Sequence, residues 1–217
     1  MIAIYNPSKQ TFFKNIVNYL ANHEEVILRE IKSAFPEKKN LEHSLEEYID
    51  AGYIVRNNRR YSNAFELVTD NDQLAFGQEF FIDTESPVFE DVKKRFIWQD
   101  LTNETNAVIL REAVDFLQEE LTLQGYFYRL KEALPLSPKQ QKLYDLLGDV
   151  NQAYALKYMT TFLLKFARKE RVIQKRKDIF VEALAILGYI EPVDAQSYTL
   201  KMELDKERML FTSCSNA

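Results

Sequence analysis

The densest group of side chains that could do chemistry is a basic run in the C-terminal third of the chain. Its members are Lys165, Arg168, Lys169, Arg171, Lys175, Arg176 and Lys177, with Glu170 as the only acid among them. Cations gathered in this way bind anions, and the phosphates of nucleic acids above all. The alternative interpretation is a solvated helix end, because cations there also complement the negative end of the helix dipole.

A second basic group lies near the N-terminal end of the chain. Arg56, Arg59 and Arg60 surround Asn57-Asn58, which tolerates the positive φ of a tight hairpin turn. These arginines could bind phosphate, or they could be solvated side chains at the exposed tip of the hairpin.

Other reactive residue types lack partners at useful spacing. His23 and His43 stand 20 positions apart without a third ligand, and Cys214 has no basic neighbour that would activate its thiol. The five glycines are not clustered, which excludes a glycine-rich phosphate loop. Consecutive acids such as Glu46 and Glu47 point to different sides of a helix. We therefore expect no catalytic residues, no metal site and no cofactor, so the protein should not be an enzyme.

Composition favours a folded protein of the cell interior. Among 217 residues, 46% are hydrophobic and 28% charged, and the net charge of −5 argues against a surface covered in phosphate-binding cations. Aromatic residues reach 13%, enough to fill cores and also what a base-stacking surface needs. A single cysteine excludes a disulfide framework, and neither a signal peptide nor an apolar run of membrane-spanning length is present. We expect a cytoplasmic protein that does not enter the membrane.

The two ends of the chain share a sequence pattern. Gly52-Tyr53-Ile54 and Gly188-Tyr189-Ile190 each follow a stretch of helical periodicity and precede a turn and a strand-like alternation. In the first copy, helices are predicted from Ser8 to His23, over residues 27–35 and from Asn40, followed by the hairpin at Asn57-Asn58. Three helices followed by a two-stranded wing predict a winged helix-turn-helix.

The second copy has the same order of parts. Ser137-Pro138 predicts a helix start, a second helix covers residues 156–166, and a third ends at Gly188. The alternation of Tyr198, Leu200, Met202 and Leu204 predicts one half-buried strand.

The middle of the chain has helical periodicity for most of its length. An extended stretch around Gly77 is followed by predicted helices from Ser86-Pro87, from about Asn106 to Leu121, and from Tyr126 to Leu134. The sequence thus predicts a mainly α, α+β chain with tandem winged helix-turn-helix modules joined by a helical middle segment. The expected domains are 1–70, the middle 71–135, the second module 136–205 and a polar tail 206–217.

The first part of the chain, roughly Met1 to Phe65, resembles a known family. The stretches Ile4-Tyr5-Asn6-Pro7-Ser8, Val26-Ile27-Leu28-Arg29-Glu30-Ile31 and Leu45 to Ile54 are similar to an uncharacterised family of streptococci, enterococci and related lactic-acid bacteria. That family is a domain of unknown function, DUF1803. The resemblance implies a bacterial cytoplasmic origin and supplies no activity.

Two functions remain open at this point. The first is association with double-stranded DNA, as a regulator or nucleoprotein component, through the two basic groups. The second is a non-enzymatic interaction module that binds another protein. The acids on the third predicted helix of the first copy and the acidic net charge favour the second function on physical grounds, whereas the common use of bacterial winged helices favours the first. We rank DNA association narrowly ahead. Homodimerisation through the apolar middle is a further expectation.

Overall fold

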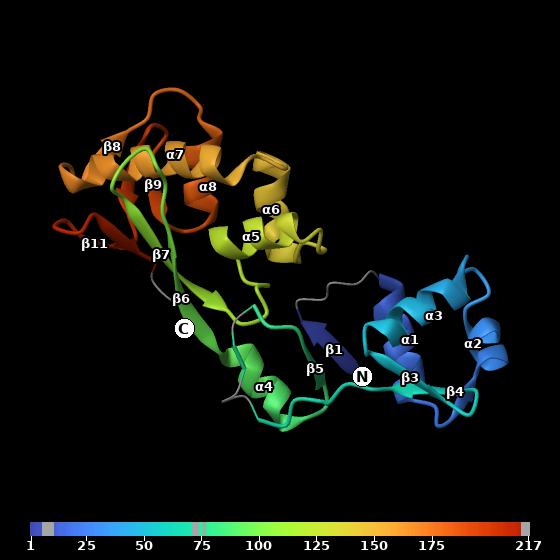
Figure 1. Cartoon of the computed structure of the whole chain (residues 1–217). Coiled ribbons are helices and arrows are strands. Elements are labelled where there is room, and N and C mark those ends of the chain that lie inside the picture. The colour runs from blue at the N-terminus through green and yellow to red at the C-terminus, as the bar shows by residue number, and fades with distance from the viewer. Residues whose placement is uncertain (6–10, 71–73, 76, 214–217) are drawn as a thin grey trace. The chain divides into compact units, whose positions relative to one another are not determined.

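A computed structural model describes residues 1–5, 11–70, 74–75 and 77–213, and the chain folds as two compact units. The units are Met1–Lys93 and Lys94–Ala217, so their boundary falls inside the predicted middle segment (Figure 1). The predicted cap Ser8 and the single cysteine Cys214 lie outside the described residues.

Unit 1 is built from short helices and strands. In chain order its elements are β1 (Ile2–Tyr5), α1 (Thr11–Ala21), β2 (Val26–Ile27), α2 (Leu28–Ala34), α3 (Leu41–Asp50), β3 (Ile54–Asn57), β4 (Arg60–Asn63), β5 (Phe80–Asp83) and α4 (Pro87–Lys94), the last residue of which falls in the second unit. Strands β2, β4 and β3 form an antiparallel sheet in that order, and β1 pairs antiparallel with β5. The helices bury one apolar stripe each, because Phe13, Ile16, Ile31 and Leu45 are at most 1% exposed.

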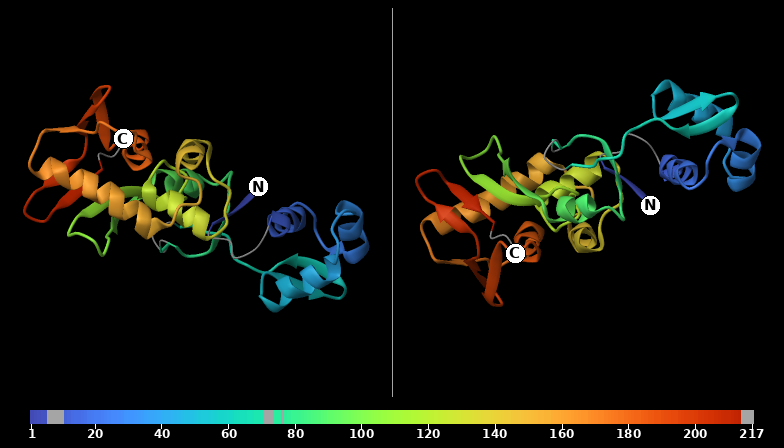
Figure 2. Two further views of the ribbon diagram at one scale, coloured as in Figure 1. Left: turned by 90° about the horizontal axis from the view of Figure 1, so that it is seen from above. Right: turned by 90° about the horizontal axis from the view of Figure 1, so that it is seen from below.

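Unit 2 contains the longer elements. They are β6 (Phe96–Leu101), β7 (Ile109–Asp115), α5 (Leu123–Lys131), α6 (Pro138–Leu147), α7 (Gln152–Leu163), the 3₁₀ turn η1 (Leu164–Ala167), β8 (Arg171–Ile173), α8 (Ile179–Ile186), β9 (Ile190–Asp194), β10 (Ser197–Leu200), β11 (Glu203–Asp205) and β12 (Leu210–Thr212). Helices α6 and α7 both pack against α8. Figure 2 shows the chain from two further sides. The core gathers residues from all these helices, with Leu143, Met159 and Leu184 fully buried.

Two sheets belong to unit 2. Strands β8, β10 and β9 form one antiparallel sheet, and β11, β12, β7 and β6 form the other in that order. Strand β12 runs parallel to β7 and buries Phe211 completely, although residues 206–217 were expected to be a polar tail. Within the described ranges, no helix has both the length and the apolar character needed to cross a bilayer.

The predicted fold class is wrong. Helices account for 39% and strands for 24% in a mixed α/β architecture with four sheets, which is not a mainly α chain. Strands β2 and β8 add a third strand to each predicted two-stranded wing. The predicted winged helix-turn-helix modules are not supported. The middle segment is not helical between α4 and α5, because β6 and β7 lie there, while β5 lies in the stretch that was expected to be extended.

Strand β7 shows why helical periodicity led to a wrong prediction between Asn106 and Leu121. Leu110, Val114 and Leu117 have helical spacing, yet the strand buries Leu110, Glu112 and Val114 on one face with a period of two. A carboxylate occupies the middle of this buried face, so the apolar alternation of a strand was hidden. Likewise the single strand predicted over Tyr198 to Leu204 is split between β10 and β11, which belong to different sheets.

Local predictions at the repeated motif are confirmed. Gly52 and Gly188 both follow a helix with φ of 79° and 75°. In each copy the tyrosine amide donates to a carbonyl five residues earlier, Tyr53 to Tyr48 and Tyr189 to Leu184, at 2.9 Å. A left-handed glycine with this hydrogen bond ends an α-helix, so both junctions use the same helix stop.

Candidate nucleic-acid interface

The basic segment, residues 165–177, connects helix α7 to helix α8. Buried side chains hold the segment at its start and middle, Phe166 and Val172, and Phe180 is buried just after its end. All three are at most 8% exposed. Asp178 caps α8 by accepting hydrogen bonds from the amides of Phe180 at 2.9 Å and Val181 at 3.4 Å. The core therefore fixes the backbone of the segment, while all seven of its cations are exposed.

Three of these cations have partners inside the protein. The Arg171 guanidinium donates to Ser197 Oγ at 2.7 Å and forms an ion pair with Asp194. Lys177 Nζ lies 3.5 Å from Glu182, although the lysine side chain is 90% exposed. Lys165 Nζ lies 4.8 Å from the ring centroid of Phe162.

The other four cations are free to bind a ligand. Among the described residues, no ion pair or side-chain hydrogen bond engages Arg168, Lys169, Lys175 or Arg176. A bound phosphate would therefore break no internal contact of these four side chains. The sequence places the seven cations in one run, but only the structure separates the free ones from the engaged ones.

The basic hairpin of unit 1 differs from the basic segment, because acidic side chains pair with two of its three arginines. Arg56 Nη1 donates to Glu46 at 2.5 Å and to the Tyr61 hydroxyl at 3.5 Å; the hydrogen bond to Tyr61, more than that to Glu46, raises the arginine pKa. Arg60 lies 3.3 Å from Glu25. Arg59 sits in the turn with φ of 66°, and its side chain has no partner within the described ranges. One hairpin cation of three is thus unengaged.

The predicted third helix of the first copy, α3, has an acidic surface that is largely paired. Glu42 lies 2.5 Å from Lys32, and Glu47 lies 3.7 Å from His43. A hollow of about 550 Å³ beside this helix is lined by Lys32, Lys38 and His43 among others. Lys38 already lies 4.6 Å from the Phe12 ring centroid, so the cations of the hollow are engaged. His23 stacks on Tyr19 in a different place, so the two histidines do not come together.

Two exposed tyrosines of α7, which no sequence motif marked, lie next to the start of α8. Tyr154 and Tyr158 of α7 are 51% and 39% exposed, and the Tyr158 ring stacks on Phe180 at the start of α8. Their four-residue spacing, on a helix whose buried face is marked by Leu156 and Met159, could have shown that they share the outer side.

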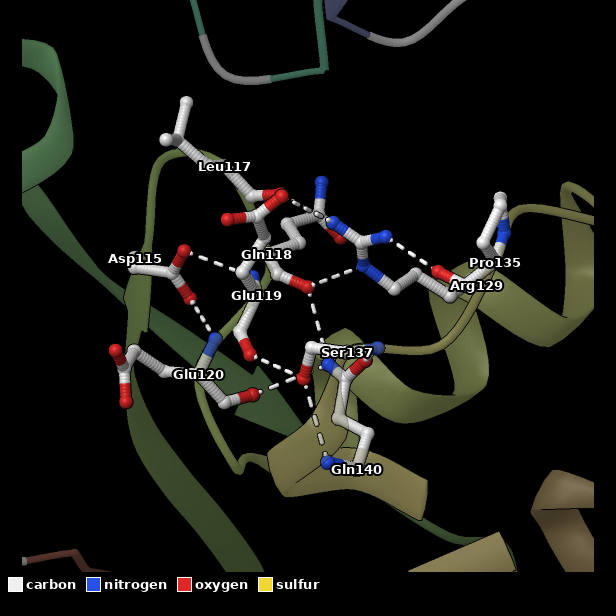
Figure 3. Close-up of polar contacts among 9 residues, drawn as sticks. All are labelled: Asp115, Leu117, Gln118, Glu119, Glu120, Arg129, Pro135, Ser137 and Gln140. Carbon is white, nitrogen blue, oxygen red and sulfur yellow. Dashed lines mark hydrogen bonds and ion pairs between the residues drawn. The ribbon is translucent and has the colours of Figure 1, made fainter. Parts of the chain in front are cut away.

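A buried polar network that the sequence did not reveal holds unit 2 together. It centres on the loop after β7, where the Asp115 carboxylate accepts the amides of Glu119 at 2.8 Å and Glu120 at 2.9 Å (Figure 3). The Gln118 carbonyl accepts Arg129 Nε at 2.7 Å and Gln140 Nε2 at 3.0 Å. The loop is thereby tied to α5 and α6.

The Arg129 side chain is the main donor of this network. Its nitrogens also bond the carbonyls of Leu117 at 3.2 Å and Pro135 at 2.5 Å, as Figure 3 shows. The guanidinium forms an ion pair with Glu119 at 3.3 Å, and the Arg129 side chain is only 12% exposed. Because it satisfies backbone carbonyls that no strand or helix uses, its role is structural.

The second buried acid is Glu112 of β7. Its carboxylate accepts the amides of Leu123 and Gln124, both at 2.8 Å, and the hydroxyl of Tyr189. Burial raises the pKa of Glu112 above its usual range, while these three hydrogen bonds oppose that rise. Solvent does not reach the side chain, and each of these donors belongs to the surrounding framework. Glu112 therefore joins β7, α5 and the second Gly-Tyr-Ile junction.

Comparison with known proteins finds a family model that matches the N-terminal part of the chain. Residues 2–95 match the model of a family described as a domain of unknown function (DUF1803). The N-terminal part of this chain therefore carries that domain, as the resemblance had indicated. No curated protein and no solved structure matches the chain.

Proposed function

We propose that the protein associates with DNA through the basic segment of unit 2. The observation that supports this is the set of four exposed cations without internal partners, Arg168, Lys169, Lys175 and Arg176. Phosphate groups attract such cations, and releasing counterions from DNA adds to the affinity. The role is that of a regulator or nucleoprotein component in the cytoplasm, without catalysis.

The charge of the whole protein makes this segment distinctive. At a net charge of −5, most of the surface repels a polyanion, so a local cluster must supply the attraction. Arg171, Lys177 and Lys165 lie in the same segment and can add to the local field although they have partners. In unit 1, Arg59 is the hairpin residue best placed to add a contact, while Arg56 and Arg60 must first leave Glu46 and Glu25.

Titration of a labelled random-sequence duplex by fluorescence anisotropy tests the proposal. We expect binding that weakens steeply between about 50 and about 200 mM salt. Replacing Lys175, Arg176 and Lys177 by glutamine should weaken low-salt binding at least about tenfold. The same change should reduce the salt slope by about one for each phosphate that is no longer neutralised.

A control variant has the same change in net charge at another place in unit 2. Lys131, Lys142 and Lys206 are exposed and lie outside the basic segment, so their replacement by glutamine should leave most of the affinity intact. Absence of low-salt binding at micromolar protein would remove the proposal, as would equal decreases in affinity for the two triple variants.

A second candidate function is protein binding, which one observation favours. Strand β6 is an edge strand that pairs only with β7 in the described part of the chain, and its Phe96 and Trp98 are 49% and 52% exposed. Exposed aromatic residues on a free sheet edge suit an added strand from a partner protein or from a second copy of the chain. A pull-down with one stoichiometric partner, abolished by Trp98→Lys, would support this alternative. Sedimentation of the purified protein would detect a homodimer.

A further inference from the structure

The outer side of helix α7 presents two tyrosine rings in a fixed arrangement. The ring centroids of Tyr154 and Tyr158 are 4.7 Å apart at an interplanar angle of 57°. Tyr158 lies nearly parallel to the Phe180 ring, with centroids 5.2 Å apart and an angle of 10°. Since Phe180 is itself 8% exposed and part of the core, it supports the exposed ring from below.

Solvent reaches a large part of both tyrosines. Tyr154 is 51% and Tyr158 is 39% exposed, and the neighbouring Ile179 at the start of α8 is 45% exposed. Aromatic rings held by their neighbours lose little conformational entropy when a flat ligand stacks on them. The surface is therefore suited to a planar, apolar group.

Positive charge borders the same rings. Lys157 Nζ lies 5.7 Å from the Tyr158 ring centroid. The basic segment ends with Lys175, Arg176 and Lys177, directly before Asp178, the residue that caps α8. Phe180, on which the Tyr158 ring stacks, follows three residues after Lys177. Lys157 therefore borders the exposed rings directly, and the exposed cations at the end of the basic segment lead into the helix that carries Phe180.

A ligand that fits this surface combines flat rings with regularly spaced negative charge. Single-stranded DNA does so, because its bases are free to stack on aromatic side chains while its phosphates follow a cationic track. A continuous duplex offers phosphates but keeps its bases stacked on each other. An acidic peptide would match the charge but leave the rings without flat partners.

We propose that Tyr154 and Tyr158 stack with unpaired bases of single-stranded DNA whose phosphates lie along the basic segment, a role that rests on the proposed phosphate contacts. The protein then prefers single-stranded DNA, or duplex with a single-stranded end, over a blunt duplex. The cations supply affinity for either form, and the tyrosines supply the difference between them.

The test compares a labelled oligothymidine with a blunt duplex of equal length, in anisotropy titrations at one salt concentration. Replacing both Tyr154 and Tyr158 by alanine should weaken binding of the single strand about five- to a hundredfold, the range expected when at least one base no longer stacks on the protein, with little change for the duplex. Tyr158→Phe keeps the ring and should retain the affinity. Tyr144, equally exposed at 39% on α6, provides the matched control as Tyr144→Ala.

A second readout reports stacking directly. An oligonucleotide with 2-aminopurine should lose fluorescence on binding to the wild-type protein and much less on binding to the double tyrosine variant. Circular dichroism establishes that each variant is folded. If the alanine variant is not folded, Tyr→Leu at both positions replaces it, because leucine keeps apolar bulk and removes the ring.

The outcomes separate this inference from the proposed function. If duplex and single strand bind alike, and the tyrosine variants bind both as the wild type does, the stacking inference fails while DNA association stands. Absence of binding to either DNA at low salt overturns both. Tighter binding of an oligoribonucleotide than of DNA with the same sequence overturns the assignment to DNA.

Discussion

The hydroxyl group of Tyr189 donates a hydrogen bond to the buried carboxylate of Glu112, which lies 77 residues earlier in the chain. The first copy of the Gly-Tyr-Ile motif has a related contact, because the Tyr53 hydroxyl donates to Glu79 at 2.5 Å. In each unit the tyrosine that follows the helix-ending glycine thus binds a glutamate from another part of the chain. The repeated motif ends a helix and also fixes that end to its surroundings.

Removing the two hydroxyl groups should have unequal effects on stability. Tyr189 is 4% exposed and Glu112 fully buried, so Tyr189→Phe should lower the free energy of unfolding by about 1–3 kcal/mol, as expected when a buried acceptor loses its donor. Tyr53→Phe should cost only about 0.5–1.5 kcal/mol, because that pair is partly exposed. Urea denaturation followed by circular dichroism measures both. Equal decreases would contradict the difference in burial.

The carboxyl group of Glu112 should make stability depend on pH in a defined direction. Burial raises its folded-state pKa above the ordinary value of 4.5, so the folded protein holds the proton more tightly than the unfolded chain does. The stabilisation from protonation is complete below pH 4.5 and disappears as the pH rises through the folded-state pKa.

Glu112→Gln provides the reference for this pH effect, because an amide does not titrate. The stability of the wild type relative to this variant should fall as the pH rises above about 4.5. If the stability of the wild type relative to Glu112→Gln instead rose with pH, the three hydrogen bonds would have a larger effect on the Glu112 pKa than burial has. The variant should also be less stable by about 1–3 kcal/mol, since its amide presents a donor to a backbone N–H.

The two helix-ending glycines should tolerate alanine equally poorly. A Cβ atom at Gly52 or Gly188 meets no atom within 4 Å, so only the positive φ opposes it. Each Gly→Ala substitution should therefore cost about 1–2 kcal/mol. Gly188→Asn should cost less, because asparagine adopts this conformation more readily. Thermal unfolding compares the three variants, and a harmless alanine at either position would contradict the shared backbone conformation.

Arg129 should be far more sensitive to substitution than an exposed arginine. Arg129→Lys removes the planar fork that serves the carbonyls of Leu117, Gln118 and Pro135, and should cost about 1–3 kcal/mol. The control is Arg111→Lys, since Arg111 makes two bonds to Asp100 at 2.6 and 2.7 Å but both side chains are about two-fifths exposed. That change should cost less than about 1 kcal/mol. Chemical denaturation should show a clear decrease in stability for Arg129→Lys alone.

Much of the local structure could be predicted because its determinants are close together in the chain. Ser137-Pro138 opens α6, where Ser137 accepts the Gln140 amide at 3.3 Å and the Gln140 side chain accepts the Ser137 amide at 3.1 Å. The predicted helix from Ser86-Pro87 is α4. The basic segment was likewise visible as a run of like charge.

The strands that join distant segments could not be predicted in the same way. The N-terminal Ile2–Tyr5 becomes β1 only through β5, and the predicted helix near Leu110 becomes β7 between β6 and β12. The hairpin turn also differs by one residue from its prediction, since Asn58 and Arg59 have the positive φ values. A strand has no internal hydrogen bonds, so its partner decides whether it forms.

By itself, the sequence determined the helix ends at Gly52 and Gly188, the apolar stripes of most helices and the position of the basic segment. Each depends on backbone preference or spacing within a few residues. Only the tertiary structure decided that Glu112 is buried, that Phe211 enters a sheet, and that the Tyr158 ring stacks on Phe180. Burying a carboxylate or pairing a strand requires donors from residues far along the chain, and only folding brings them together.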